Sequence, residues 1–143
     1  MVIFKLMKKI KNQKIVVSGI LKKENKILIA RRPLTKKIAP GLYHLPGGHV
    51  EFGEHPGKAL QREFWEEFKL PISTDDVVRV FSYQDDSSHT VGITYKILSE
   101  DIPKTIWFDP KDNDDVIWVK ENEVKNFFSS DDHDYLTILK YFS

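Results

Sequence analysis

The sequence predicts a single α/β domain over residues 1–143, in which a mixed β-sheet packs against helices. Short apolar runs bounded by turn residues recur along most of the chain and indicate strands. Two longer segments repeat apolar residues at helical spacing. Hydrophobic residues make up 41% of the chain and aromatic residues 12%, and a chain of this size buries roughly 68–70% of its unfolded surface. These proportions support a folded core and exclude global disorder.

The strands are expected to begin with a hairpin near the N-terminus. Two apolar runs, 14–21 and 26–30, flank the polar turn "KKEN", and this arrangement is a hairpin signal. The segments "DDSS" and "DPKDNDD" are polar turns between later strands. The later strands are expected at 77–84, 89–98, 106–108 and 116–119.

Three segments carry helical signals. Pro56 suits the first position of a helix, and Phe64 and Phe68 belong to an apolar repeat of every fourth residue. Asp131 or Asp132 is expected to cap the last helix, whose sequence continues as "YLTILKYF". The helices are expected at 56–69, 121–128 and 131–142.

Composition limits the chemistry and the location of the protein. Cysteine is absent, which excludes disulfides, thiolate metal sites and cysteine nucleophiles. No apolar run reaches the ~18 residues that a membrane span needs, and the N-terminus lacks the apolar segment and cleavage site of a signal peptide. We therefore expect a cytoplasmic protein with no membrane partner.

Charge is distributed unevenly along the chain, although the net charge is only +1. Residues 1–40 contain 12 Lys and Arg and a single acid, whereas residues 41–143 contain 10 Lys and Arg and 20 Asp and Glu. The basic segment is either a solvated surface or one side of a site for an anion such as a phosphate chain. An RNA-binding surface on residues 5–37 is a further alternative, but no recognition motif accompanies it, so a nucleic-acid partner is not expected.

The stretch "REFWEEF" at 62–68 gathers three glutamates on one face of the expected helix. On an α-helix Glu63 and Glu67 lie about 40° apart, and Glu66 lies about 60° to the other side. This face borders the apolar stripe of Phe64 and Phe68, where an unpaired charge is costly. Carboxylates at this spacing suit Mg²⁺ or Mn²⁺, so the face is either a divalent metal site or an ordinary acidic helix flank.

The loop before this helix favours the metal site. Five residues separate Gly48 from Glu54, and seven more separate Glu54 from Arg62. From Gly48 to Leu70 the spacing resembles the Nudix box, G-x5-E-x7-R-E-U-x-E-E-x-G-U, in which U is a bulky apolar residue. Every polar position of this pattern is present. The clear departure is Lys69, which stands where the pattern has a glycine that ends the helix with a left-handed turn.

The segment "KILIARRPLTKKIAPGLYHLPGGHVEFGE" extends the resemblance to the MutT-like branch of the family. The resemblance implies a Nudix α/β/α sandwich with a mixed sheet, and a hydrolase that uses Mg²⁺, or alternatively Mn²⁺. It implies that metal ions are held by the Gly47 carbonyl, Glu63, Glu66 and Glu67. It assigns roles in catalysis to Glu63 and Glu66, and to Arg62, which would point away from the metals and pair with Glu54.

Further ligands and substrate contacts are expected outside the box. The loop "FDPKDNDDVIW" offers Asp112, Asp114 or Asp115 as an additional metal ligand, and we favour Asp114 over its neighbours; an acidic solvated turn is the alternative. Tyr43, Leu45, Phe81 and Tyr83 are candidates for the wall of a base pocket, and core packing is the alternative favoured for at least two of them. The residues expected to contact substrate are Arg32, Tyr43, Leu45, Gly48 and Tyr83.

The substrate is expected to be a nucleoside triphosphate, cleaved to a monophosphate and pyrophosphate. The stretch "LPGGHVEFGE" resembles the triphosphate branch, and the proline that the ADP-ribose branch carries after the box is missing between Pro71 and Pro103. The alternatives are an ADP-ribose or dinucleoside polyphosphate pyrophosphatase, or a Nudix-fold binding module without catalysis. The expected partner is a small nucleotide, and a homodimer stays open.

Overall fold

The structure is a computed structural model that describes residues 12–143; residues 1–11, which carry part of the basic segment discussed above, lie outside the described residues. In chain order the elements are β1 (Asn12–Ile20), β2 (Lys22–Lys23), β3 (Lys26–Arg31), β4 (Tyr43–His44), β5 (Gly47–His49), α2 (Pro56–Phe68), β6 (Ser73–Gln84), β7 (Ser88–Leu98), β8 (Asp115–Lys120), the 3₁₀ helix η1 (Glu121–Asn126) and α3 (His133–Phe142). Within this part of the chain, no helix is long and apolar enough to cross a membrane.

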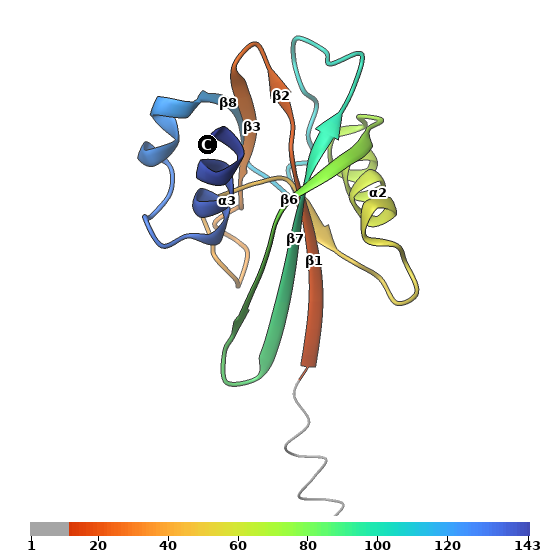
Figure 1. Cartoon of the computed structure of the whole chain (residues 1–143), viewed down its shortest axis with the longest axis vertical. Helices are drawn as coiled ribbons and strands as arrows, with labels where there is room; N and C mark the ends of the chain where they lie inside the picture. Colours follow the sequence, from red (N-terminus) through yellow and green to blue (C-terminus); the bar gives the residue numbers. More distant parts are fainter. Residues whose placement is uncertain (1–11) are drawn as a thin grey trace, which may run out of the picture.

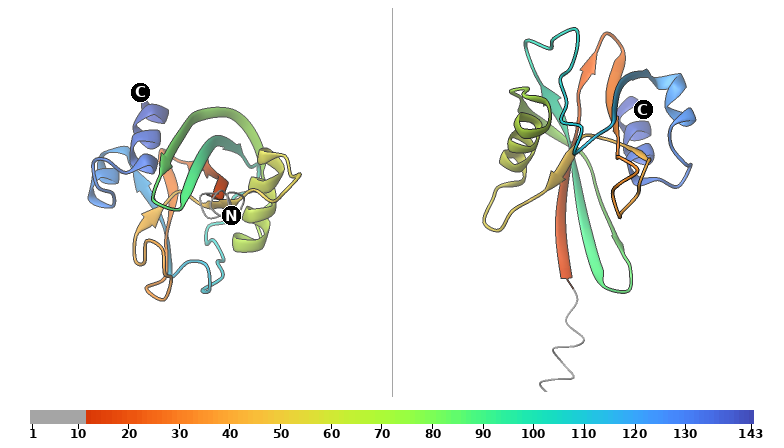
Figure 2. Two further views of the ribbon diagram at one scale, coloured as in Figure 1. Left: turned by 90° about the horizontal axis from the view of Figure 1, so that it is seen from below. Right: turned by 180° about the vertical axis from the view of Figure 1, so that it is seen from behind.

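The strands form two sheets. The first has the order β5-β1-β7-β6, in which β1 runs parallel to β7 and the other neighbours are antiparallel. The second contains β2, β3 and β4, with β8 paired to β3. Helices α2 and α3 lie on opposite sides of the strands (Figures 1 and 2). The predicted α/β sandwich with a mixed sheet is therefore confirmed.

Each helix covers its own apolar core. Leu60, Phe64 and Phe68 on α2 are buried against the first sheet, where they join Val17 and Ile97. The second core lies between the second sheet and the C-terminal elements. It includes Ile20, Ile27, Ile29, Val119, Val124 and Ile138.

The structure corrects several of the expected elements. The N-terminal hairpin is formed by β2 and β3, whereas β1, which covers most of the run 14–21, pairs with β5 and β7 in the other sheet. The segment 106–108 is not a strand, although its exposed Trp107 between inward-facing neighbours gives the alternation of one. The next amide, Asp109 N–H, donates to the Glu67 carbonyl at the end of α2 instead of to a strand. The segment 121–128 forms a 3₁₀ helix over Glu121–Asn126 instead of an α-helix. Strand β6 begins four residues before the expected position, because a register irregularity lets it continue past Val77.

The ends of α2 explain how its box sequence is held. His55 Nδ1 accepts a 3.0 Å hydrogen bond from the Gly57 amide and caps the N-terminus. At the other end Lys69 adopts the left-handed conformation, with φ 52° and ψ 34°, which costs a residue other than glycine roughly 1 kcal/mol. The Lys69 ammonium lies 5.7 Å from the ring centroid of Trp65 and 5.8 Å from that of Trp107. Two exposed cation–π contacts stabilise by about 1–2 kcal/mol together, enough to offset this strain.

Candidate active site

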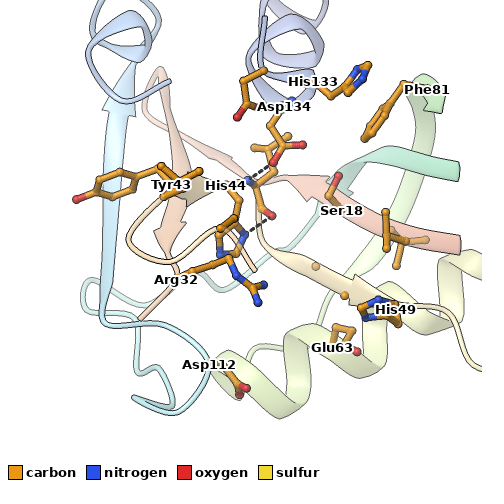
Figure 3. A pocket seen from close by; sticks show the side chains of 18 of the residues that line it. Ser18, Arg32, Tyr43, His44, His49, Glu63, Phe81, Asp112, His133 and Asp134 are labelled. Carbon is orange, nitrogen blue, oxygen red and sulfur yellow. Dashed lines mark hydrogen bonds between the residues drawn. The ribbon is translucent and has the colours of Figure 1, made fainter. Parts of the chain in front are cut away.

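A cavity of about 700 Å³ lies between the two halves of the fold. Its volume falls within the roughly 300–1,000 Å³ typical of small-molecule sites. Figure 3 shows Glu63 and Asp112 at one end, Phe81 and His133 at the other, and Arg32 between them. The cavity therefore joins an acidic end to an aromatic end.

The acidic end is built by α2 and the two glycines of β5. Gly47 and Gly48 pair with Ser18 and Val17 of β1. A Cβ added at Gly48 would lie 2.3 Å from Glu63 Cδ, so only glycine leaves room for that carboxylate. A Cβ at Gly47 would lie 1.9 Å from the Val17 carbonyl oxygen. The paired glycines thus let β5 lie against both β1 and the glutamate face of α2.

Glu67 is the most strongly perturbed acid of this end. Burial, and after it the negative charges of Glu63, Asp112 and Glu66, raise its pKa to about 9, while Arg32 opposes this rise. Its Oε2 atom is buried and has no hydrogen-bond partner among residues 12–143. A buried carboxylate without a partner is costly, and a hard divalent cation would supply the missing partner. The residues present therefore fit a divalent metal ion.

Glu63 is partly buried and accepts a hydrogen bond from Arg62. Burial raises its pKa, and the hydrogen bond from Arg62 opposes this rise. Among residues 12–143, no three acidic or histidine side chains already form a closed metal cage. The expected ligand set of Gly47, Glu63, Glu66 and Glu67 therefore stays a prediction.

Arg62 ties the preceding loop to α2, as the pattern predicts. Its Nε donates to Glu54 Oε2 at 2.9 Å and its Nη2 to Glu54 Oε1 at 3.0 Å, while Nη2 also donates to the His49 carbonyl. This fork holds the pKa of Glu54 at about 2. Its Nη1 also donates to Glu63 at 3.0 Å and to Glu66 at 3.3 Å, so Arg62 contacts two of the expected metal ligands, and its orientation away from the metals stays a prediction. The Glu66 side chain is 56% exposed and lies outside the cavity wall.

The acidic loop brings Asp112 to the cavity, although the sequence favoured Asp114. Asp114 forms a 2.7 Å ion pair with Arg31, and Asp115 accepts a 2.7 Å hydrogen bond from the Tyr43 hydroxyl. Asp112 is the carboxylate of this loop that lines the cavity and raises the pKa of Glu67. The structure therefore favours Asp112 as the additional acidic group.

The aromatic end is formed by three nearly parallel rings. Phe81 and Tyr83, two residues apart on β6, both stack on His133 at the start of α3, with ring centroids 4.5 Å and 5.6 Å from it. The Phe81 ring lies over Gly92 of β7, where an added Cβ would clash with it. Tyr83 was expected here from the sequence, whereas His133 was missed because nothing in its local sequence distinguishes it from a capping segment.

Asp134 and Leu45 form the inner wall beside these rings. The Leu45 amide donates a 2.9 Å hydrogen bond to Asp134 Oδ2. Burial raises the pKa of Asp134 to about 7. Leu45 lines the cavity and also belongs to the second core, and its contact with a substrate stays a prediction. The sequence did not single out Asp134.

Arg32, Tyr43 and Gly48 also lie on the cavity wall, as expected for substrate contacts. Arg32 is at the same time a structural residue, because its Nε donates a 2.8 Å hydrogen bond to the Ile38 carbonyl of its own loop. Tyr43 packs edge-on against Phe127 at 5.1 Å. Contact of these residues with a substrate stays a prediction.

Comparison with known proteins places this geometry in a family. Residues 12–139 match the model of the NUDIX domain. A protein named nucleoside triphosphatase NudI from Klebsiella pneumoniae (strain 342) is 32% identical, with 80% of this chain and 87% of that protein covered. An ADP-ribose pyrophosphatase from Methanocaldococcus jannaschii is 35% identical over 57% of this chain and 48% of its own length.

Solved structures agree on the fold. A MutT protein from Methanosarcina mazei Go1 superposes with a TM-score of 0.77 at 18% identity and covers 92% of this chain and 94% of its own. A NUDIX hydrolase from Nitrosomonas europaea gives 0.75 at 16% identity, with 92% and 89% covered. At these identities the likeness concerns the fold.

The chain belongs to the Nudix family and is a MutT-like member of it. It is a hydrolase of pyrophosphate bonds that acts on nucleoside diphosphate derivatives, in a family that generally uses divalent metal ions. The resemblance stated from the sequence is confirmed.

Proposed function

We propose that the protein is a Mg²⁺-dependent pyrophosphohydrolase that cleaves a nucleoside triphosphate to a monophosphate and pyrophosphate. The observation that carries this proposal is that one and the same cavity has an acidic end at Glu63 and an aromatic end at Phe81 and His133. A nucleotide has the complementary polarity, since its phosphates suit a metal-bearing acidic end and its base suits the face of an aromatic ring. The nucleoside triphosphatase named among the relatives supports the same substrate class.

We assign metal binding and proton transfer in this reaction to residues at the acidic end of the cavity. Glu63, Glu67 and Asp112 would hold Mg²⁺, together with the Gly47 carbonyl. When bound, Mg²⁺ neutralises phosphate charge and lowers the pKa of the attacking water. Arg62 keeps Glu63 in place through its 3.0 Å hydrogen bond. In this reaction the oxygen of the water adds to phosphorus and the bridging P–O bond breaks. We assign Glu63 to accept the proton that the water releases.

The remaining wall would orient the nucleotide. Arg32 and Lys36 line the cavity and supply positive charge toward a phosphate chain. Phe81 has His133 against one face and Gly92 beneath the other, so the rings of Tyr83 and His133 are the aromatic surfaces left for a base. Stacking on such a ring tolerates different bases, because every base has an aromatic face.

The proposal is tested by product analysis with each common nucleoside triphosphate, in the presence of Mg²⁺ and of EDTA. We expect equal amounts of monophosphate and pyrophosphate, and no turnover with EDTA. Release of orthophosphate instead of pyrophosphate would contradict the proposed bond. Turnover by the parent separates an enzyme from a binding module. The Glu67→Gln variant then tests the metal site: it should lose most of the activity, whereas activity within threefold of the parent would refute the assigned role.

ADP-ribose is the second candidate substrate. The relative from Methanocaldococcus jannaschii favours it, because that protein bears the name ADP-ribose pyrophosphatase and is 35% identical in the aligned region. Comparing kcat/KM for ADP-ribose with that for the triphosphates decides between them. Turnover of ADP-ribose alone would exclude the triphosphate proposal while leaving the assigned metal-binding residues in place.

A further inference from the structure

The lysine that departs from the Nudix box lies between two tryptophans. Lys69 follows the last turn of α2, and its ammonium lies 5.7 Å from the Trp65 ring centroid and 5.8 Å from that of Trp107. The two tryptophans are 54% and 51% exposed, although they come from different segments of the chain. Trp65 belongs to α2, whereas Trp107 belongs to the loop before β8. The ammonium therefore bridges the helix and that loop.

Backbone contacts continue from this bridge to the cavity. The Asp109 amide, two residues after Trp107, donates a 3.1 Å hydrogen bond to the Glu67 carbonyl. The Asp109 carbonyl then accepts from the amides of Asp112 and Asn113, both at 3.1 Å. This turn directs the loop to the cavity, which Asp112 lines. The lysine bridge at Trp107 is thus separated from Asp112 on the cavity wall by only five positions in the sequence.

At position 69 glycine would adopt the left-handed backbone conformation with less strain than lysine, because φ there is 52°. A glycine, however, has no side chain that reaches Trp107. The lysine is therefore better explained by its bridge than by the turn it occupies.

We infer that Lys69 is a positioning residue that holds the loop 107–113 on the C-terminal end of α2. In doing so it keeps Asp112 beside the carboxylates of Glu63 and Glu67. The role of Asp112 toward Mg²⁺ rests on the proposed function, whereas the attachment of the loop does not.

Hydrogen exchange of the Asp109 amide tests the attachment in the metal-free protein. Lys69→Met and Lys69→Gly each remove both cation–π contacts, so the protection factor of this amide should fall about 5- to 30-fold. Lys69→Arg keeps a cation over the rings and should stay within about threefold of the parent. Lys58→Met is the matched control, because Lys58 is exposed on the same helix. Protection that is unchanged or increased in Lys69→Gly would show that the residue serves only the helix end and would overturn the inference.

Calorimetric titration with Mg²⁺ alone tests the consequence for the site. Lys69→Met and Lys69→Gly should weaken Mg²⁺ binding in proportion to the fraction of molecules in which the loop is detached, and by at most about 5- to 30-fold, and Lys69→Arg should restore it. In turnover assays such variants should need more Mg²⁺ for half-maximal rate, while kcat at saturating Mg²⁺ stays within about twofold. Mg²⁺ affinity that does not follow the attached fraction measured at the Asp109 amide would overturn the link to Asp112. If no triphosphate is hydrolysed, exchange and calorimetry still decide the inference, so its failure is separate from that of the proposed function.

Discussion

Asp134, in the first turn of α3, should make the stability of the protein depend on pH. Burial raises its pKa from 3.8 to about 7; Asp132 adds to this rise, and the Leu45 amide and Arg79 oppose it. The folded protein therefore keeps this carboxyl protonated at pH values where the unfolded chain has released the proton. Stability is fully present below the unfolded pKa and is lost as pH rises from about 4 to about 7.

The size of the effect follows from the same two pKa values. About three pH units at ~1.36 kcal/mol each give an upper limit of about 4 kcal/mol. Asp134 lines the cavity and keeps part of its surface exposed, so screening by solvent reduces this value to on the order of 2 kcal/mol. The substitution Asp134→Asn keeps an oxygen for the Leu45 amide and removes the charge. The variant should match the parent near pH 4 and exceed its free energy of unfolding by about 2 kcal/mol at pH 8.

Urea unfolding followed by tryptophan fluorescence at several pH values measures this difference. The difference between variant and parent is the informative quantity, because other groups also titrate. His44, for example, has its pKa lowered by burial, so its contribution is lost as pH falls below 6.5. A difference that does not change between pH 4 and pH 8, or that has the opposite sign, would refute the assigned protonation of Asp134.

Three further substitutions test other parts of the site. Gly48→Ala should lower kcat at least tenfold with little change in melting temperature, because the new Cβ lies 2.3 Å from Glu63 Cδ and its nearest contacts are all atoms of that side chain; unchanged kcat would show that the position of Glu63 is not critical. Arg62→Lys keeps the charge but loses the fork to Glu54, so urea unfolding should show a free energy lower by about 1–3 kcal/mol, and an unchanged value would mean that the fork contributes nothing. Arg32→Ala should raise KM for the triphosphate more than it lowers kcat and should weaken the dependence of KM on salt; an unaltered KM would remove Arg32 from the phosphate site.

The parts of the site that could be predicted are those encoded in one continuous segment. Helix α2 begins at Pro56, and its glutamates share a face because their spacing alone determines it. The pairing of Arg62 with Glu54 was implied by the resemblance of this same segment to the Nudix box. These features depend on residues close together in the chain, so no knowledge of the tertiary fold is needed.

The aromatic end could not be predicted in full because it depends on contacts between distant segments. His133 stacks on Phe81, which lies 52 positions earlier in the sequence. Asp134 becomes a perturbed acid only because the surrounding core buries it, while the hydrogen bond from the Leu45 amide opposes the shift. Likewise Asp114 was favoured over Asp112 because the sequence does not reveal that Arg31 pairs with Asp114.

The parallel pairing of β1 with β7 affects how the chain can fold. Its partners are 76 positions apart, as in Ser18 and Thr94. Closing so long a loop costs conformational entropy before any contact forms, and pairings of this kind slow folding relative to local ones. The antiparallel neighbours β6 and β7 need no such closure, because a short turn joins them. During synthesis on a ribosome, β1 is made first among the strands of its sheet. Its apolar Val17 and Ile20 gain their neighbours on β7 only after β7 has been made.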